Sequence, residues 1–121
     1  MKVGESMASS SISSDYMRGS LDPIILRVLL DGDSYGYEII KAVSHNSGGI
    51  YELKEPSLYT SLKRLEALSC VTSYWGNESQ GGRRKYYRIT PKGRQLYETS
   101  LAQWKQARDL IDQLIERRAQ P

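Results

Sequence analysis

One pair of strand-forming segments constrains the fold of this chain more than any other feature. Residues 71–75 (VTSYW) and 85–90 (KYYRIT) are rich in the β-branched and aromatic residues that favour extended strands. The polar segment 76–82 (GNESQGG) separates them and supplies the glycines that a turn needs. The sequence therefore predicts a β-hairpin here, and the rest of the fold must be built around it.

The chain before the hairpin shows three helical patterns of apolar residues. The first runs to about Leu30. It begins at the N-cap and first-residue pair Asp22 and Pro23, or starts earlier with a kink at Pro23. We expect Ser34 to cap the second helix, which ends in segment 46–49, and Pro56 to open the third. The leucines expected to face the core from the third helix are Leu58, Leu62, Leu65 and Leu68.

Three helices followed by a hairpin and a long helix predict a winged helix-turn-helix, mainly α-helical with a small β-hairpin. We place this domain at residues 17–90 and a long C-terminal dimerisation helix at residues 91–121. Residues 1–16 contain six serines and few large apolar side chains, so we expect a disordered tail there.

Basic charge is concentrated around the hairpin. Residues 78–94 contain six lysines and arginines against one glutamate, while the net charge of the whole chain is only +3. The rest of the chain is therefore net negative. This distribution is typical of a nucleic-acid footprint.

A winged helix-turn-helix places its third helix in the major groove of double-stranded DNA. The positions of that helix that we expect to contact DNA are Ser57, Tyr59, Thr60, Lys63 and Arg64. Glycines in the hairpin loop let the backbone approach the duplex, and arginines beside them can bind phosphates or enter the minor groove. The loop positions expected to contact DNA are Gln80, Gly81, Gly82, Arg83, Arg84 and Lys85.

The long last helix is expected to begin after a Thr90 cap and to present one apolar face. An a/d-like series, spaced alternately by four and three residues, consists of Tyr97, Leu101, Trp104, Arg108, Ile111 and Ile115. This face exceeds what a small domain can cover, so a homodimer is the simplest prediction.

Other function classes lack the residues that they need. Cys70 and His45 are the only cysteine and histidine, so an ordinary zinc site cannot be assembled, and we expect neither a metal nor a cofactor. No nucleophile with its base, paired carboxylate motif or phosphate loop indicates an enzyme. No apolar run approaches the roughly 20 residues of a membrane helix, and no signal peptide is apparent, so we expect a cytoplasmic protein.

Three segments make the chain similar to a known family. They are residues 35–40 (YGYEII), 55–66 (EPSLYTSLKRLE) and 73–90 (SYWGNESQGGRRKYYRIT). Over about residues 17–118 the chain resembles the PadR family of bacterial transcriptional regulators, in particular the short subgroup with one C-terminal helix. The resemblance implies a homodimeric repressor that binds a DNA operator, with the C-terminal helices in the interface.

The resemblance extends to multidrug-responsive members of the family, and implies a pore at the dimer centre that takes planar aromatic molecules. Trp104 falls on the position of a tryptophan that stacks on the drug, and stacking on an indole suits planar ligands. Asp22 and Pro23 fall on the pore wall. The candidate ligand contacts are Trp104, Arg108, Leu101, Asp22, Pro23 and Arg27.

Two of these positions depart from the multidrug pattern. Arg108 stands where those members have an acidic residue, and Arg27 replaces a small polar residue. Because two arginines per subunit would repel cations, we expect a preference for neutral or anionic planar ligands, or no drug function. Asp109 and Asp112 are close enough in sequence to offset this charge.

Two alternatives remain beside the ligand-responsive repressor. One is a DNA-binding regulator whose dimer centre is filled and takes no small molecule. The other is a winged-helix module that binds protein, although such a wing does not need the charge of Arg83, Arg84 and Lys85.

Overall fold

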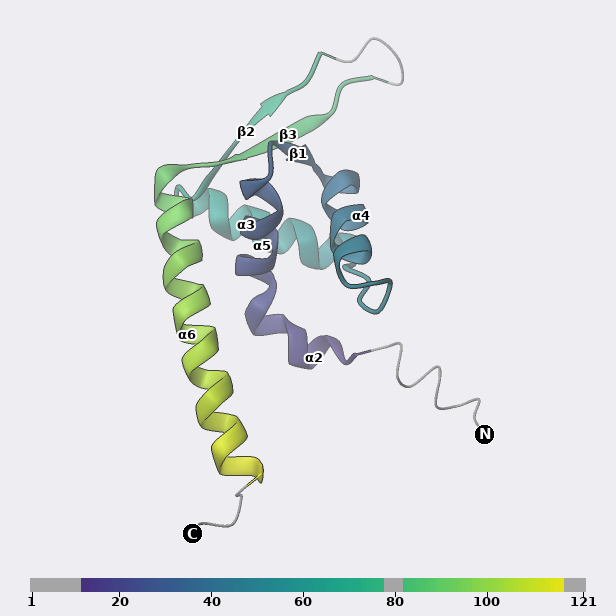
Figure 1. Ribbon diagram of the computed structural model, residues 1–121. Helices are drawn as coiled ribbons and strands as arrows, with labels where there is room; N and C mark the ends of the chain where they lie inside the picture. Colours follow the sequence, from purple (N-terminus) through teal and green to yellow (C-terminus); the bar gives the residue numbers. More distant parts are fainter. Residues whose placement is uncertain (1–11, 78–81, 117–121) are drawn as a thin grey trace, which may run out of the picture.

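The computed structural model describes residues 12–77 and 82–116, and has the expected winged helix-turn-helix architecture (Figure 1). Short helical turns open the described chain, followed by three core helices, a small sheet and one long helix. The elements are α2 Ser14–Met17, the 3-10 turn η1 Arg18–Ser20, α3 Leu21–Leu30, β1 Ser34–Tyr35, α4 Gly36–Asn46, α5 Glu55–Ala67, β2 Val71–Trp75, β3 Lys85–Ile89 and α6 Pro91–Glu116.

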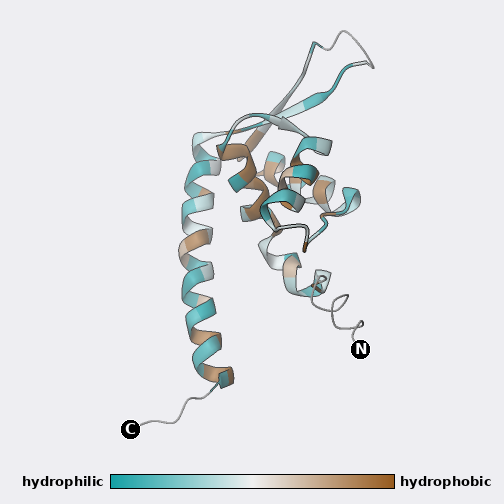
Figure 2. Cartoon of the chain, turned by 45° about the vertical axis from the view of Figure 1, so that its right-hand side comes forward, coloured by the Kyte–Doolittle hydropathy of each residue, from teal (hydrophilic) through white to brown (hydrophobic). Residues whose placement is uncertain are grey.

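The core lies where α3, α4 and α5 meet under the sheet (Figure 2). Its fully buried side chains include Ile25 and Leu26 of α3, Ile39 of α4 and Leu58 of α5. These residues recur at helical spacing, so each helix turns one apolar face inward and leaves a polar face outside. The apolar pattern thus predicted the three packed helices correctly.

The sheet has three strands, not two. Residues 34 and 35, where a helix cap was expected, form β1 and pair antiparallel with β3 in the strand order β1-β3-β2. Ser34 therefore does not cap α4, whose N-cap is the extended residue Tyr35 without a side-chain capping bond. Two residues are too short to show an alternating strand pattern, and only the neighbouring β3 makes this segment a strand.

The first core helix begins before Asp22, which agrees with the earlier of the two predicted starts. Ser20 is the N-cap of α3, and Asp22 lies inside its first turn rather than capping it. Pro23 sits in the same turn, where a missing N–H breaks no helical hydrogen bond.

Part of the expected disordered tail is helical. Within residues 1–16, positions 14–16 belong to α2, whose cap is the Ser13 hydroxyl accepting from the Asp15 amide. Serine-rich composition predicts disorder, but a single serine in such a segment can also cap a helical turn. Residues 1–11 lie outside the described residues.

Leu68 does not face the core. It is 46% exposed, whereas Leu58, Leu62 and Leu65 are buried. The residue lies at the C-cap of α5, and the next residue, Ser69, has a φ of 63°. Because the chain leaves the helix there, the helical spacing no longer decides which way Leu68 points.

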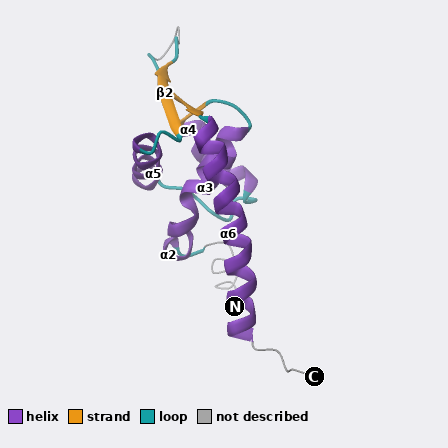
Figure 3. Cartoon of the chain, turned by 90° about the vertical axis from the view of Figure 1, so that its left-hand side faces the viewer, coloured by secondary structure: helices purple, strands orange, loops and turns teal. Residues whose placement is uncertain are grey.

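The long helix α6 begins as expected. The Thr90 hydroxyl accepts from the Gly93 amide at 3.0 Å and donates to the Ser69 carbonyl at 2.7 Å. A side chain at Gly93 would collide with the Cys70 carbonyl, so glycine lets the first turn of α6 lie against the chain before β2. Figure 3 shows the rest of α6 extending well past the helical core. None of the helices in the described ranges is both long enough and apolar enough to cross a membrane.

Candidate nucleic-acid interface and apolar pocket

The outer face of α5 is polar and accessible. The buried leucines of this helix leave Tyr59, Thr60 and Lys63 exposed, and Ser57 partly exposed. At the first turn the N-cap residue Lys54 makes no side-chain capping bond. The exposed face therefore offers hydroxyl and ammonium groups of the kind that hydrogen-bond base edges and phosphates.

Tyr59 has a second role that the sequence pattern did not reveal. Its ring lies directly against Gly36, the first residue of α4, and a Cβ there would collide with the Tyr59 hydroxyl. Gly36 thus lets α4 and α5 approach closely, while the tyrosine ring remains 45% exposed. This contact fixes the angle of the helix-turn-helix, so Tyr59 serves packing as well as any DNA contact.

Arg64, also expected to contact DNA, is held by another helix. Its Nε and Nη2 donate to the two carboxylate oxygens of Asp22 at 2.9 and 2.8 Å, and Nη2 also donates to Ser61 at 3.1 Å. The hydrogen bonds and charge of Asp22 raise the pKa of Arg64. The structure thus joins two residues that the sequence assigned to separate sites, and Asp22 is turned toward α5.

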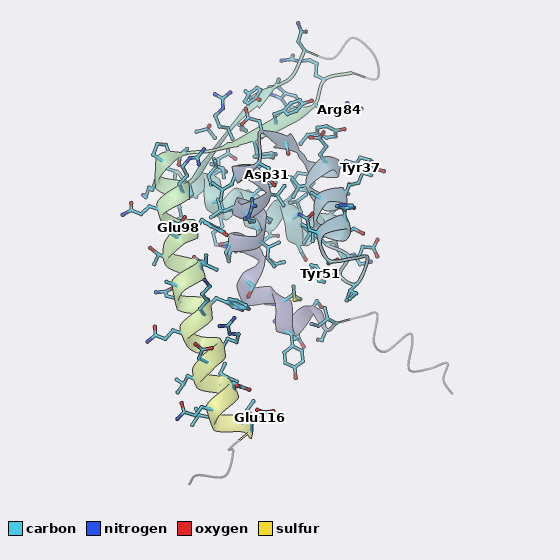
Figure 4. The ribbon with its side chains drawn as sticks, viewed as in Figure 1. Asp31, Tyr37, Tyr51, Arg84, Glu98 and Glu116 are labelled. Atoms are coloured by element: carbon cyan, nitrogen blue, oxygen red, sulfur yellow. The ribbon has the colours of Figure 1, made fainter. Side chains whose placement is uncertain are left out.

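The two strands β2 and β3 form the wing, with basic side chains stacked on aromatic rings. Arg83 lies 5.4 Å from the Trp75 ring centre, Arg84 lies 4.6 Å from that of Tyr35, and the Lys85 amine lies 5.8 Å from that of Tyr87. Figure 4 shows Arg84 above the helical core, at the wing end of the molecule. All three basic side chains are exposed.

The wing loop is only partly described. Gly82 has a φ of 87°, a conformation that glycine adopts at no steric cost. Gln80 and Gly81 lie outside the described residues, so their expected DNA contacts remain predictions.

A cluster at the base of the wing was missed by the sequence reasoning. The Tyr74 hydroxyl donates to Asp33 Oδ2 at 2.6 Å, and Arg88 Nε donates to the same oxygen at 3.0 Å. Partial burial acts to raise the pKa of Asp33, but hydrogen bonds from Tyr74 and Arg88, and the charge of Arg88, hold it below its ordinary value. The partners are 41 and 55 residues from Asp33, so no local spacing could have predicted the cluster.

An apolar pocket of about 420 Å³ lies between the N-terminal turns, α3 and α6. Four of the predicted ligand contacts line it: Pro23, Arg27, Leu101 and Trp104. Asp22 does not, because it faces Arg64, and Arg108 is not among the lining residues either. The residues before α3 that the sequence reasoning missed are Ile12, Tyr16, Met17 and Ser20.

The two arginines near Trp104 each have an acidic partner on their own helix. Arg27 pairs with Asp31 at 2.9 Å, and this hydrogen bond and charge raise the pKa of Arg27. Arg108 pairs with Asp109 at 3.1 Å, and its guanidinium lies over the Trp104 ring, 5.0 Å from the centre. The positive charge is therefore partly compensated, and Arg108 already stacks on the indole.

The apolar row of α6 is uncovered in the single chain. Trp104 is 48% exposed and Ile111 51%, and the exposure rises to 75% at Ile115. Exposed apolar surface of this extent is typical of an interface.

Comparison with known proteins now decides the family. The model of the transcriptional regulator PadR-like family matches residues 25–99, from α3 to the first part of α6. The chain belongs to the PadR-like family of transcriptional regulators. This finding confirms the resemblance that the sequence segments indicated, though not a place among the multidrug-responsive members.

Individual relatives agree with this family. The regulator is 40% identical over 105 residues to an uncharacterized protein of Lysinibacillus sphaericus, a match that covers 87% of this chain and 96% of the relative. It superposes with a TM-score of 0.78 and 43% identity on a transcriptional regulator from Clostridium thermocellum, covering 84% of this chain and 96% of that one. Bacillus subtilis PadR, solved in complex with operator DNA, matches at a TM-score of 0.62 and 27% identity, over 70% of this chain and 48% of its own.

Proposed function

We propose that this PadR-like regulator is a homodimeric repressor that binds a double-stranded DNA operator. The observation that supports this most directly is the pairing of one polar helix face with one basic wing. Thr60 and Lys63 on α5 suit the major groove, and Arg83 and Arg84 on the wing suit the flanking phosphates or minor groove. The similarity to Bacillus subtilis PadR, solved with operator DNA, supports the same reading.

The dimer would form through α6. The exposed apolar residues of this helix recur at a/d-like spacing, so a second copy of the helix would bury them without any other change. A two-fold dimer also places two recognition helices on one face, where they can reach successive major grooves about 34 Å apart.

The ligand of this dimer would be a planar aromatic molecule, neutral or anionic, in the pocket beside Trp104. The pocket is lined mainly by apolar groups and by one arginine, Arg27. An indole ring at its edge offers a stacking surface, and an anionic ligand would compete with Asp31 for Arg27. Binding there would change the angle between α6 and α3, and with it the spacing of the recognition helices.

A regulator without a ligand is the second candidate, and one observation favours it. Leu101 and Trp104 belong both to the pocket lining and to the apolar row that a partner helix would cover. The partner would then fill the space itself.

The first experiment measures binding of the full chain to the DNA upstream of its own gene and to an unrelated duplex, across a salt series. We expect much tighter binding to the upstream DNA, weakening steeply as salt rises, because each phosphate contact releases counterions. Equal and weak binding to both duplexes would contradict the operator function and favour a protein-binding module.

A second experiment separates the two candidates. Tryptophan emission is followed while a planar anionic dye, and then a cationic analogue of the same shape, is added. We expect quenching by the anionic dye that is lost in a Trp104→Ala variant, which retains the emission of Trp75. Unchanged dye affinity in that variant would contradict stacking on Trp104, and tighter binding of the cation would contradict the charge preference.

A further inference from the structure

We propose that α3 sets the angle between the recognition helix α5 and the wing, through an acidic residue at each end of α3. This inference rests on the proposed DNA-binding function and goes beyond it. It assigns positioning roles to Asp22, in the first turn of α3, and to Asp33, three residues after its end. Neither residue lies on the exposed face of α5 or on the wing itself.

The first contact holds the recognition helix. Asp22 accepts from two nitrogens of Arg64 with nearly equal distances of 2.9 and 2.8 Å, which is the two-point geometry that restricts a guanidinium most. Arg64 lies one position after Lys63 and one turn after Thr60, the two side chains that we expect to face the major groove. A large rotation of α5 about its axis would therefore break this contact.

The second contact holds the wing. Asp33 accepts from Tyr74 on β2 and from Arg88 on β3, so one carboxylate oxygen joins both strands to the end of α3. Arg88 also lies over the Tyr74 ring at 5.0 Å, and Tyr74 stacks on Tyr86 at 5.6 Å. These contacts resist a swing of the wing relative to the helical core.

The two contacts differ from the other ion pairs of the described chain. The Asp22 and Asp33 side chains are 23% and 27% exposed, whereas Asp31, between them, is 69% exposed. Asp31 pairs with Arg27 on its own helix, so it joins no two elements. Exposed local pairs of this kind contribute little, while partly buried pairs with several hydrogen bonds hold geometry more firmly.

The helix between the two acids is suited to act as a rigid connection. Ile25, Leu26 and Leu29 fix it in the core, where they are at most 2% exposed. The same helix packs on α4, α5 and α6, and provides Pro23 and Arg27 to the wall of the apolar pocket. DNA binding requires the recognition helix and the wing to fit a groove and its neighbouring backbone at the same time. A preset angle therefore avoids the cost of ordering them on the duplex.

The experiment uses the full chain and two duplexes. One is selected by the wild-type protein from a random pool, and the other is a shuffled duplex of the same composition. Affinities are measured at several salt concentrations for the wild type, Asp22→Asn, Asp33→Asn and the matched control Asp31→Asn. Circular dichroism and sedimentation compare the fold and the oligomeric state of each variant.

For Asp22→Asn we expect a loss of roughly ten-fold on the selected duplex and less than about two-fold on the shuffled one, because misplacing α5 affects base contacts rather than phosphate contacts. For Asp33→Asn we expect weaker binding to both duplexes and a salt dependence shallower by about one counterion, because wing phosphate contacts are lost. Asp31→Asn should stay within about two-fold of the wild type on both, as expected for an exposed local pair.

If an asparagine variant does not fold, Arg64→Lys and Arg88→Lys replace the two tests, because they keep the charge and lose the planar two-point geometry. Arg64→Lys should give the affinities expected for Asp22→Asn, and Arg88→Lys should give the affinities and salt dependence expected for Asp33→Asn. Two outcomes would overturn this inference alone while the wild type remains selective. In one, the Asp22 and Asp33 variants behave like Asp31→Asn. In the other, they lose affinity for both duplexes equally, with an unchanged salt dependence. A wild type that selects no duplex would overturn the proposed function and this inference together.

Discussion

The helices α5 and α6 have similar apolar repeats but opposite environments. In α5 the repeated leucines are at most 1% exposed, because α3 and α4 cover them. In α6 only the first two turns contact the core, and from Trp104 onward the large apolar residues are about half exposed or more. An apolar repeat therefore predicts which face of a helix is buried, but not whether the same chain or a second one covers it.

Truncating a buried leucine of α5 should have the largest effect. Leu62→Ala is expected to lower the free energy of unfolding by about 2–5 kcal/mol, because it leaves a cavity among well-packed neighbours. Chemical denaturation measures this. Leu114→Ala on α6 is the matched control, and its effect should vary with protein concentration, as expected where a partner provides the burial. Equal, concentration-independent losses at both positions would remove the distinction between the two helices.

Placing a charge in the exposed apolar row of α6 should give the next largest effect. Ile111→Asp is expected to weaken dimer formation by at least about 100-fold, because each interface would receive two like charges without partners. Sedimentation measures the oligomeric state, and circular dichroism checks that the monomer keeps its helices. The same substitution at Gln106, which is outside the a/d-like series, should leave the oligomeric state unchanged. A dimer that survives Ile111→Asp would show that α6 is covered in another way.

The outer faces of the two helices provide a smaller test. Lys63→Gln on α5 should weaken DNA binding a few-fold and reduce the salt dependence by about one counterion, since it removes one phosphate contact. Lys105→Gln on α6 removes the same charge and should change neither quantity. If both substitutions weaken DNA binding equally, the effect would come from net charge alone, and α5 would have no special place at the duplex.

The smallest expected effect is a pH dependence of stability that comes from Asp33 at the base of the wing, and not from α6. Burial opposes ionisation of Asp33, but the hydrogen bonds from Tyr74 and Arg88 and the charge of Arg88 outweigh it, so its pKa in the folded protein is lowered. Its stabilising contribution is therefore complete above the unfolded-state value of about 3.9, and is lost as the pH falls toward the lower folded value.

The melting temperature of the wild type should accordingly fall more steeply below about pH 4 than that of Asp33→Asn, which lacks this carboxylate. Identical pH profiles for the two proteins would mean that the hydrogen bonds to Asp33 do not persist in solution.

Features that depend on near neighbours could be predicted from the sequence. The hairpin strands, the Thr90 cap and the inward face of α5 follow from residues within one or two turns of each other. Helix and strand periodicity, capping and turn chemistry act over such distances, so these expectations agree with the structure.

Features that join distant segments depend on how the helices and strands pack together. The strand at residues 34 and 35 exists because β3 lies beside it, and Leu68 is exposed because the chain turns away after α5. The contact between Asp22 and Arg64 spans 42 residues, and it pairs a residue predicted to contact DNA with a residue predicted to contact the ligand. A charged side chain can pair with any opposite charge that the fold brings near. Its partner is therefore fixed by the packing of helices and strands, not by spacing along the chain.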